Sequence, residues 1–273
     1  MIIKLYGLNI TELSYTIVLY KKEKWEYIHV HSTLWKEIAM EKYKLRIIDI
    51  VEEAPGIISY YFEKPLDLDW SEGAHVHIGH IGFDEGELPN KALVRHMSIT
   101  TLPSENKLGI TTRVPGSSSE FKRRLSELTL GDEVIFFKFG SRMCLRHEKR
   151  PLILLSMGVG MATIRPMLLA YLKNSTDIPL LINVNVNSTK EHLFRAELEQ
   201  QTVHPYQSYW LNAREDFYKL RDQLSKQNNA LFYIVGSDEF MRENIVFLMN
   251  KGVCMDDIIL DRKEEKRREY FDF

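Results

Sequence analysis

Hydrophobic and polar residues follow two different patterns along this chain, and the change falls near Pro151. Before this proline, short runs of alternating apolar and polar residues end in Gly, Pro, Asn or Asp. These runs cover residues 45–51, 57–62, 75–78, 92–94, 108–112 and 133–139. Many short strands separated by turn residues are typical of an antiparallel sandwich or barrel. Between Ser119 and Leu130 the apolar residues fall at helical spacing, which predicts one short helix within the barrel.

After Pro151 continuous apolar runs alternate with helical segments. The predicted strands are 152–155, 180–184, 209–211, 231–235 and 258–260, and the predicted helices are 162–172, 193–198, 217–224 and 238–250. Strands that are apolar on both faces and separated by helices indicate a parallel sheet covered on both sides. The sequence therefore predicts a β plus α/β fold, an antiparallel barrel followed by a Rossmann-like parallel sheet.

The first forty-two residues fit neither pattern. Residues 16–20 and 27–30 predict a hairpin, and Ser32 predicts the start of a helix that continues to Ala39. This segment carries no catalytic pattern, and it either packs on the barrel or offers an interaction surface. The predicted organisation is thus an N-terminal extension over 1–42, a barrel domain over 43–149, and an α/β domain with a C-terminal tail over 150–273.

Composition and charge exclude several classes of protein. The 273 residues are 44% hydrophobic and 27% charged, as in ordinary globular proteins, and the net charge of −2 gives no reason to expect a nucleic-acid partner. No apolar run approaches the roughly 20 residues that span a bilayer, and the N-terminus lacks the features of a signal peptide. These observations predict a cytoplasmic protein without a membrane span.

Cysteine and histidine content argues against a metal centre. Cys144 and Cys254 cannot supply the four thiolates that an iron–sulfur cluster usually needs, and their apolar surroundings predict two buried free thiols. His75 and His77 share one face of a predicted strand, but no further ligand completes a zinc-like set.

Three segments lie where one predicted element ends and the next begins. Arg95-His96-Met97-Ser98 follows the strand 92–94, and the forked guanidinium of its arginine suits a phosphate group. Gly116-Ser117-Ser118-Ser119 precedes the barrel helix, where backbone N–H groups form an anion site. Gly158-Val159-Gly160-Met161-Ala162-Thr163 leads from a buried strand into a helix, an arrangement that seats a nucleotide pyrophosphate. Taken singly, these are also a strand-end arginine, a serine-capped helix and an ordinary turn.

A fourth segment, Gly236-Ser237, ends the strand 231–235. The order of the four segments makes residues 43–261 resemble the ferredoxin–NADP⁺ reductase superfamily. The resemblance implies that the barrel binds FAD and that the α/β domain binds NADPH or NADH, which passes a hydride to the flavin. It assigns a role to each segment: Arg95 at the flavin phosphate, Ser98 beside flavin N5 with Met97 against the ring, Gly116, Ser117, Ser118 and Ser119 at the flavin pyrophosphate, Gly158, Gly160, Ala162, Thr163, Gly236 and Ser237 at the nicotinamide nucleotide, and Asp261 close to the flavin.

Four positions depart from the pattern of the superfamily. Met97 replaces a tyrosine, Thr163 a proline and Val235 a cysteine, while Asp261 stands where a longer glutamate is common. Asp261 is open to a second interpretation, a surface carboxylate at a strand end.

The predicted function is a flavoprotein oxidoreductase with catalytic Ser98 and Asp261 and no metal. The coenzyme is undecided, although Asn187–Lys190, Arg195 and Arg214 offer partners for a 2′-phosphate. The electron acceptor is ferredoxin, flavodoxin, a ferric chelate or a partner oxygenase. Two alternatives remain: an electron-transfer subunit that works only in a larger complex, and a degenerate nucleotide-binding sensor. The charged segment 262–269 predicts a solvated tail or helix face, and the closing aromatic residues 270–273 have the flavin face as one option for docking.

Overall fold

The computed structural model describes residues 3–9, 14–21, 24–31, 41–114, 116, 119–200 and 205–272, and for the first three ranges it describes the backbone alone. The chain divides into two compact units, Met1–Tyr43 and Lys44–Phe273. None of the helices within the described ranges has the length and apolar character that a bilayer-spanning helix requires.

The N-terminal unit contains a three-stranded antiparallel sheet in the order β1-β2-β3. Its strands are β1 (Ile3–Asn9), β2 (Ser14–Lys21) and β3 (Lys24–His31). The pairing of Lys21 with Lys24 confirms the predicted hairpin. The helix predicted from Ser32 to Ala39 lies outside the described residues.

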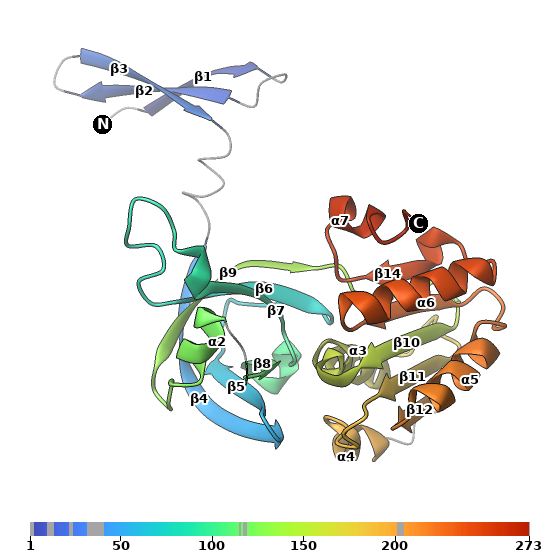
Figure 1. Cartoon of the computed structure of the whole chain (residues 1–273). Helices are drawn as coiled ribbons and strands as arrows, with labels where there is room; N and C mark the ends of the chain where they lie inside the picture. Colours follow the sequence, from blue (N-terminus) through green and yellow to red (C-terminus); the bar gives the residue numbers. More distant parts are fainter. Residues whose placement is uncertain are drawn as a thin grey trace. The chain divides into compact units, whose positions relative to one another are not determined.

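The larger unit begins with a six-stranded antiparallel sheet in the order β7-β6-β9-β4-β5-β8 (Figure 1). Beyond the end of β7, the Thr100 N–H donates to the Gly109 carbonyl of β8 at 2.8 Å, so the two edge strands approach each other and the sheet curls into a barrel. The elements of this half are β4 (Lys42–Ala54), β5 (Ile57–Glu63), β6 (Ala74–His80), η1 (Lys91–Leu93), β7 (Val94–Ser98), η2 (Pro103–Glu105), β8 (Lys107–Arg113), α2 (Glu120–Leu125) and β9 (Glu133–Ser141).

Two predictions in the barrel half need correction. Residues 92–94 were expected to form a strand, but they lie largely in the 3₁₀ turn η1, whose start Asn90 caps by accepting the Ala92 N–H. The strand β7 instead contains the Arg95–Ser98 segment itself. The barrel helix α2 ends at Leu125, earlier than the apolar spacing predicted, and it buries Phe121 and Leu125.

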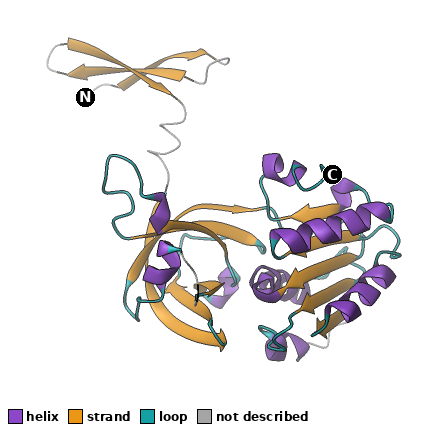
Figure 2. Ribbon diagram, viewed as in Figure 1, coloured by secondary structure: helices purple, strands orange, loops and turns teal. Residues whose placement is uncertain are grey.

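The second half is a five-stranded parallel sheet in the order β12-β11-β10-β13-β14. Figure 2 shows helices on both of its faces, as the alternation of strands and helices predicted. The elements are β10 (Leu152–Met157), η3 (Gly158–Gly160), α3 (Met161–Lys173), β11 (Leu181–Val186), α4 (Arg195–Glu199), β12 (Tyr206–Leu211), α5 (Arg214–Leu224), β13 (Leu231–Val235), α6 (Asp238–Asn250), η4 (Met255–Asp257), β14 (Ile258–Leu260) and α7 (Glu264–Arg268).

Successive residues of the parallel strands point to opposite faces, and each face has its own helices. Leu152 and Leu154 of β10 pack with α3, whereas Ile153 and Leu155 pack with α5 and α6. This division explains why these strands are continuous apolar runs, because both faces are buried.

The C-terminal tail docks on the α/β half. Tyr270 is 5% exposed, and its hydroxyl donates to Asp238 at the start of α6 at 2.5 Å. Phe271 packs against the apolar cluster that includes buried residues of α5 and α6. Cys144 and Cys254 are both free and exposed, so the prediction of buried thiols is wrong. Both lie in connections between elements, where neighbouring apolar letters in the sequence do not imply burial.

One apolar core runs through both halves of the larger unit. Ala54 and Ile57 from the barrel and Met143 from the connection after β9 belong to the same buried cluster as Leu152 and Met161. Continuity of this kind accounts for the grouping of barrel and parallel sheet in one compact unit.

A buried arginine adds a polar connection between the halves. Arg165 of α3 is 7% exposed. It donates to Glu105 of η2 at 2.8 and 3.1 Å and to the Thr100 carbonyl at 2.9 Å, both on the barrel side. It also forms a bidentate pair with Glu197 of α4 at 2.6 and 2.8 Å. The guanidinium is therefore surrounded by acceptors from three separate segments, a geometry that suits its planar, forked set of donors.

We expect Arg165→Met to lower the free energy of unfolding by about 3–5 kcal/mol, because it leaves two carboxylates and a carbonyl without their buried cation. Urea titration monitored by tryptophan fluorescence measures this change. The control is Arg195→Met, which removes an exposed pair with Glu199 and should cost less than about 1 kcal/mol. Equal, small effects of the two substitutions would show that the Arg165 cluster does not hold the halves together.

Candidate functional site

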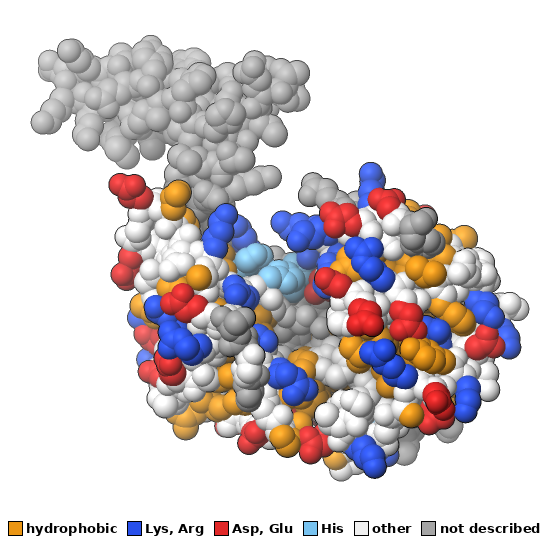
Figure 3. All heavy atoms as spheres, viewed as in Figure 1, with side chains coloured by type: hydrophobic (Ala, Val, Ile, Leu, Met, Phe, Trp, Pro, Cys, Tyr) orange, Lys and Arg blue, Asp and Glu red, His pale blue; other side chains and the backbone are white. Residues whose placement is uncertain are grey.

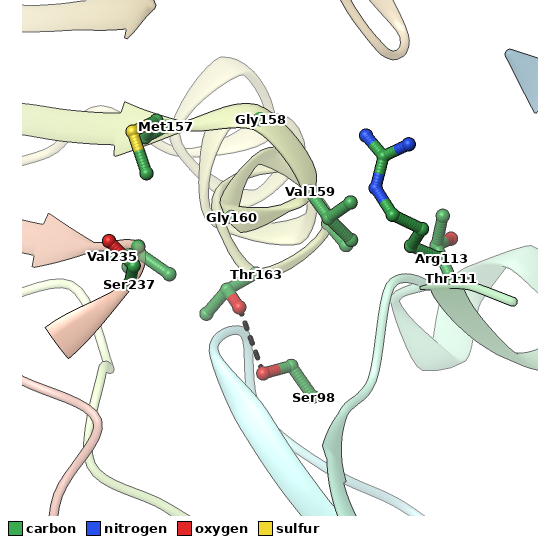
Figure 4. A pocket seen from close by; sticks show the side chains of 12 residues that line it. Ser98, Thr111, Arg113, Met157, Gly158, Val159, Gly160, Thr163, Val235 and Ser237 are labelled. Carbon is green, nitrogen blue, oxygen red and sulfur yellow. Dashed lines mark hydrogen bonds between the residues drawn. The ribbon is translucent and has the colours of Figure 1, made fainter. Parts of the chain in front are cut away.

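A cavity of about 440 Å³ lies where the carboxyl ends of β10 and β13 meet the ends of β7 and β8. Figure 4 shows its labelled side chains converging from these strands and from the start of α3. Seven residues that the sequence singled out line it together: Ser98, Gly158, Gly160, Ala162, Thr163, Gly236 and Ser237. Val235 lines it as well.

A hydrogen bond joins the two halves within this cavity. The Thr163 hydroxyl donates to the Ser98 hydroxyl oxygen at 2.8 Å (Figure 4). Because the Ser98 oxygen accepts this bond, its own proton is left to point elsewhere in the cavity. The threonine that replaces the proline of the superfamily therefore holds the serine that the resemblance places beside the flavin.

Glycine is required in this cavity for two different reasons. A Cβ at Gly160 would lie 2.7 Å from the Val235 carbonyl oxygen, and a Cβ at Gly236 would lie 2.6 Å from the Phe240 ring. Both positions require close approach of the backbone. Gly158 instead has a φ of +53°, and nothing lies within 4 Å of its missing Cβ. The backbone at Gly158 is thus open to the cavity, as it must be for a bulky anionic group to approach.

The first and second segments also meet. The Arg95 guanidinium donates to the Ser119 hydroxyl at 2.7 Å and to the Val94 carbonyl at 2.8 Å. Ser119 is the N-cap of α2, and the preceding Gly116 has a φ of +73° with open space beyond it. The structure therefore brings Arg95 and Ser119 together, while Ser117 and Ser118 lie outside the described residues.

Two further cations gather at this place. Lys122 of α2 donates to the Arg113 carbonyl at 2.8 Å. Burial lowers the pKa of the Lys122 ammonium, and the positive charges of Arg95 and Arg113 lower it further. Arg113 itself lines the cavity. Three cations near one another destabilise each other unless an anion neutralises them.

The sequence reasoning missed Arg113 and Lys122. Arg113 carried the same signal as Arg95, a cation at the end of a strand followed by a turn. Lys122 had no sequence signal, because the segment 120–124 is rich in charge and only folding shows which of its cations turns inward.

A second cavity of about 270 Å³ continues from the first, sharing Arg113, Met157 and Gly158 with it. Its walls include Asn187, Ser188, Thr189, Asn212, Arg214 and Tyr218. Of the cations considered for a 2′-phosphate, Arg214 lines this cavity, whereas Arg195 is engaged with Glu199 at 2.9 Å.

Asp261 lies away from these two cavities. Its side chain is 10% exposed, 3.4 Å from Nδ1 of His75 and 3.6 Å from Nη1 of Arg142. Burial opposes ionisation of this carboxyl, but the neighbouring His75, His96 and Arg142 lower its pKa overall. The interpretation of Asp261 as a surface carboxylate is therefore wrong.

Two predictions remain, the role of Met97 and the absence of a metal site. Met97 lies on β7 opposite Val76 of β6, at a register that places it on the other face of the strand from Ser98. No three His, Cys, Asp or Glu side chains in the described part of the chain are arranged to hold a metal ion.

Comparison with known proteins gives matches in structure alone. Neither a family model nor a curated protein sequence matches this chain. A ferredoxin NADP⁺ reductase from Neisseria gonorrhoeae, solved with FAD and NADP, has a TM-score of 0.68 at 14% identity over 81% of this chain and 98% of its own. The FAD/NAD-binding domain of nitric oxide dioxygenase from Vibrio cholerae has a TM-score of 0.63 at 18% identity over 80% of this chain and 97% of its own.

A longer protein also matches. The flavohemoglobin of Malassezia yamatoensis, solved with FAD and heme, has a TM-score of 0.64 at 14% identity over 84% of this chain. This chain spans 63% of that protein's length. The antiparallel barrel followed by the five-stranded parallel sheet is thus the fold that this chain shares with these three proteins.

Proposed function

We propose that this chain is a flavoprotein oxidoreductase that binds FAD, accepts a hydride from NADPH and passes electrons to an external acceptor. The observation that carries the proposal is the cavity in which Ser98 of the barrel meets Gly160, Thr163 and Gly236 of the α/β half. Both halves contribute, since the barrel side offers Ser98 and Arg113 and the α/β side offers the Thr163 hydroxyl and the open backbone at Gly158.

The residues of the barrel fit a flavin dinucleotide. Arg95, Arg113 and Lys122 form a cationic cluster that an FAD diphosphate would neutralise. The open space beyond Gly116 leaves room for phosphate oxygens next to Ser119. A charge-assisted bond from a forked guanidinium is the strongest single contact available to such a group.

Ser98 is the residue that we place at the reacting edge of the ring. FAD, when bound, supplies the two-electron chemistry with the nicotinamide and the transfer to an acceptor. The chain positions the groups: Thr163 holds the Ser98 oxygen, and the Ser98 proton remains available for flavin N5. The close approach of Gly160 to the Val235 carbonyl forms the surface of the cavity against which the nicotinamide would pack.

The second cavity favours NADPH over NADH. An acidic side chain after the second strand of such a sheet binds the ribose 2′-hydroxyl of NADH, whereas arginine accommodates a 2′-phosphate. Here Asn187, Ser188 and Thr189 follow β11, and Arg214 at the start of α5 faces the same cavity. These uncharged donors beside Arg214 suit a phosphate, because Glu243, the carboxylate among the residues that line this cavity, is paired with Arg221 at 3.1 Å.

The direct test is anaerobic titration of the FAD-loaded protein with NADPH. We expect the visible absorbance band of the flavin to bleach and to return when an acceptor is added. A protein that holds FAD but is not reduced by NADPH or NADH would contradict the proposal. A chain that cannot be loaded with FAD at all would indicate a nucleotide-binding role of another kind.

Arg95→Ala should weaken FAD binding about 10- to 150-fold, because it removes a charge-assisted contact worth roughly 1.5–3 kcal/mol. Fluorescence quenching of FAD measures the dissociation constant. Arg123→Ala is the control, since Arg123 lies on α2, the helix that begins after Ser119, is 59% exposed and pairs with Glu127. Equal affinity of the two variants would remove Arg95 from the flavin site.

Ser98→Ala and Thr163→Val should each slow flavin reduction about 2- to 10-fold with FAD content nearly intact, since each removes one hydrogen bond of about 0.5–1.5 kcal/mol. Stopped-flow absorbance at saturating NADPH gives the rate. The double variant should be no slower than Ser98→Ala if Thr163 acts through Ser98. Additive losses would mean that the threonine acts independently.

Arg214→Ala should raise the KM for NADPH about tenfold or more and leave the KM for NADH unchanged, because only NADPH carries the 2′-phosphate. Steady-state kinetics with both coenzymes provide the comparison, and Arg195→Ala serves as a nearby control. A parallel rise in both KM values would place Arg214 outside the 2′-phosphate site.

A further inference from the structure

A third cavity, of about 500 Å³, lies next to the proposed reaction site. His77 and His96 form its barrel side, and the segment from Asp261 to Tyr270 forms much of the other. On β7, Ser98 lines the first cavity and His96 the third. At the start of α6, Ser237 lines the first cavity and Asp238 the third. The third cavity is therefore a neighbour of the place where the flavin ring would be reduced.

The walls of this cavity carry a surplus of positive charge. Five basic side chains line it, Arg142, Arg242, Arg262, Lys263 and Lys266, against three acidic ones, Asp238, Asp261 and Glu269. The whole chain, in contrast, has a net charge of −2. Histidine and basic side chains gather around the hollow visible in Figure 3.

Two of the three carboxylates have basic side chains of the protein as close neighbours. Asp238 accepts from Arg262 at 3.2 Å and from the Tyr270 hydroxyl at 2.5 Å. Asp261 lies among His75 and Arg142. Lys263 and Lys266 are exposed and have no ion-pair partner among the described residues, so their charges remain available to a ligand.

His77 and His96 on the barrel side contribute hydrogen-bonding groups without charge. Their rings lie close together, with centroids 4.3 Å apart for His75 and His96 and 5.2 Å apart for His77 and His96. Burial lowers the pKa of His96 to about 4 and also lowers that of His77. At neutral pH the basic residues alone therefore set the sign of the cavity.

We propose that this cavity binds the electron acceptor, and that the acceptor is a small molecule with several negative charges. The role as acceptor site rests on the proposed function, whereas the binding of an anion does not. A cavity of about 500 Å³ falls in the range of small-molecule pockets, roughly 300–1,000 Å³, and is too small to enclose a protein partner.

The electron balance is simple for a one-electron acceptor. One NADPH gives up a hydride, which is two electrons and a proton, and becomes NADP⁺. Two acceptor molecules each gain one electron and one unit of negative charge, and one proton is released to water. The cations attract the oxidised acceptor, and the added negative charge of the reduced acceptor strengthens this attraction at short range.

The first test measures binding and needs no turnover. Hexacyanocobaltate(III), a redox-inert trianion, is titrated calorimetrically into the FAD-loaded protein at low ionic strength. We expect the Lys263→Gln/Lys266→Gln variant to bind it about tenfold more weakly than the wild type, which corresponds to about 1.4 kcal/mol. The control, Lys219→Gln/Lys226→Gln, changes net charge equally at exposed positions on α5 and just after its end and should bind like the wild type. Equal affinity of all three proteins would overturn the inference.

The second test uses two octahedral acceptors of similar size and opposite charge, ferricyanide and hexaammineruthenium(III). The ratio of kcat/KM for ferricyanide to that for the ruthenium complex should fall about tenfold in the Lys263→Gln/Lys266→Gln variant. An unchanged ratio would show that the acceptor does not use this cavity. If neither complex is reduced by any variant, the proposed function fails, whereas the result with hexacyanocobaltate still decides the anion site.

Discussion

The arrangement of this protein depends on the buried guanidinium of Arg165. Its donors reach Glu105 and the Thr100 carbonyl on the barrel side and Glu197 on the α/β side. A buried arginine is tolerated only when its charge and its donors are all matched. The clamp therefore fixes a single relative placement of the two halves, because any shift would leave a charged group unpaired.

The same helix that carries the clamp also carries the site. Thr163 lies two residues before Arg165, and Ser98 lies two residues before Thr100. The bond between Thr163 and Ser98 thus belongs to the same interface as the bond between Arg165 and the Thr100 carbonyl. Because Arg165 and Thr163 are neighbours on α3, and Thr100 and Ser98 are neighbours at the end of β7, the ion cluster also positions the two hydroxyls. The contact between Gly160 and the Val235 carbonyl fixes the third side of the cavity in the same way.

Much of this fold could be predicted from the sequence because its two halves have different periods. Continuous apolar runs after Pro151 follow directly from burial of both sheet faces, and short runs separated by turn residues mark the strands before it. The errors lie where local pattern and tertiary context disagree. The apolar residues 92–94 suggest a strand, but Asn90 caps a 3₁₀ turn there, and the strand begins only at Val94.

The candidate site divides in the same manner. The turn positions of Gly158 and Gly160 were predictable, because turns have strong local signatures. Arg95 was expected to follow a strand, whereas it is the second residue of β7. The cationic role of Lys122 and the burial of Asp261 were not predictable, since each depends on side chains from distant segments. A charge in a polar stretch carries no local sign of whether it faces water or the interior.

The apolar cluster shared by both halves limits how far the barrel and the α/β half can be separated or exchanged. Ala54, Ile57 and Met143 on the barrel side belong to the same buried cluster as Leu152 and Met161, so part of the interior is common to the two halves. A barrel separated at Pro151 would expose this seam to water, and so would the parallel sheet. Exchange of one half for that of a distant relative would require a matching seam on the incoming piece. Divergence in this chain is therefore expected to proceed by paired changes across the seam rather than by replacement of one half.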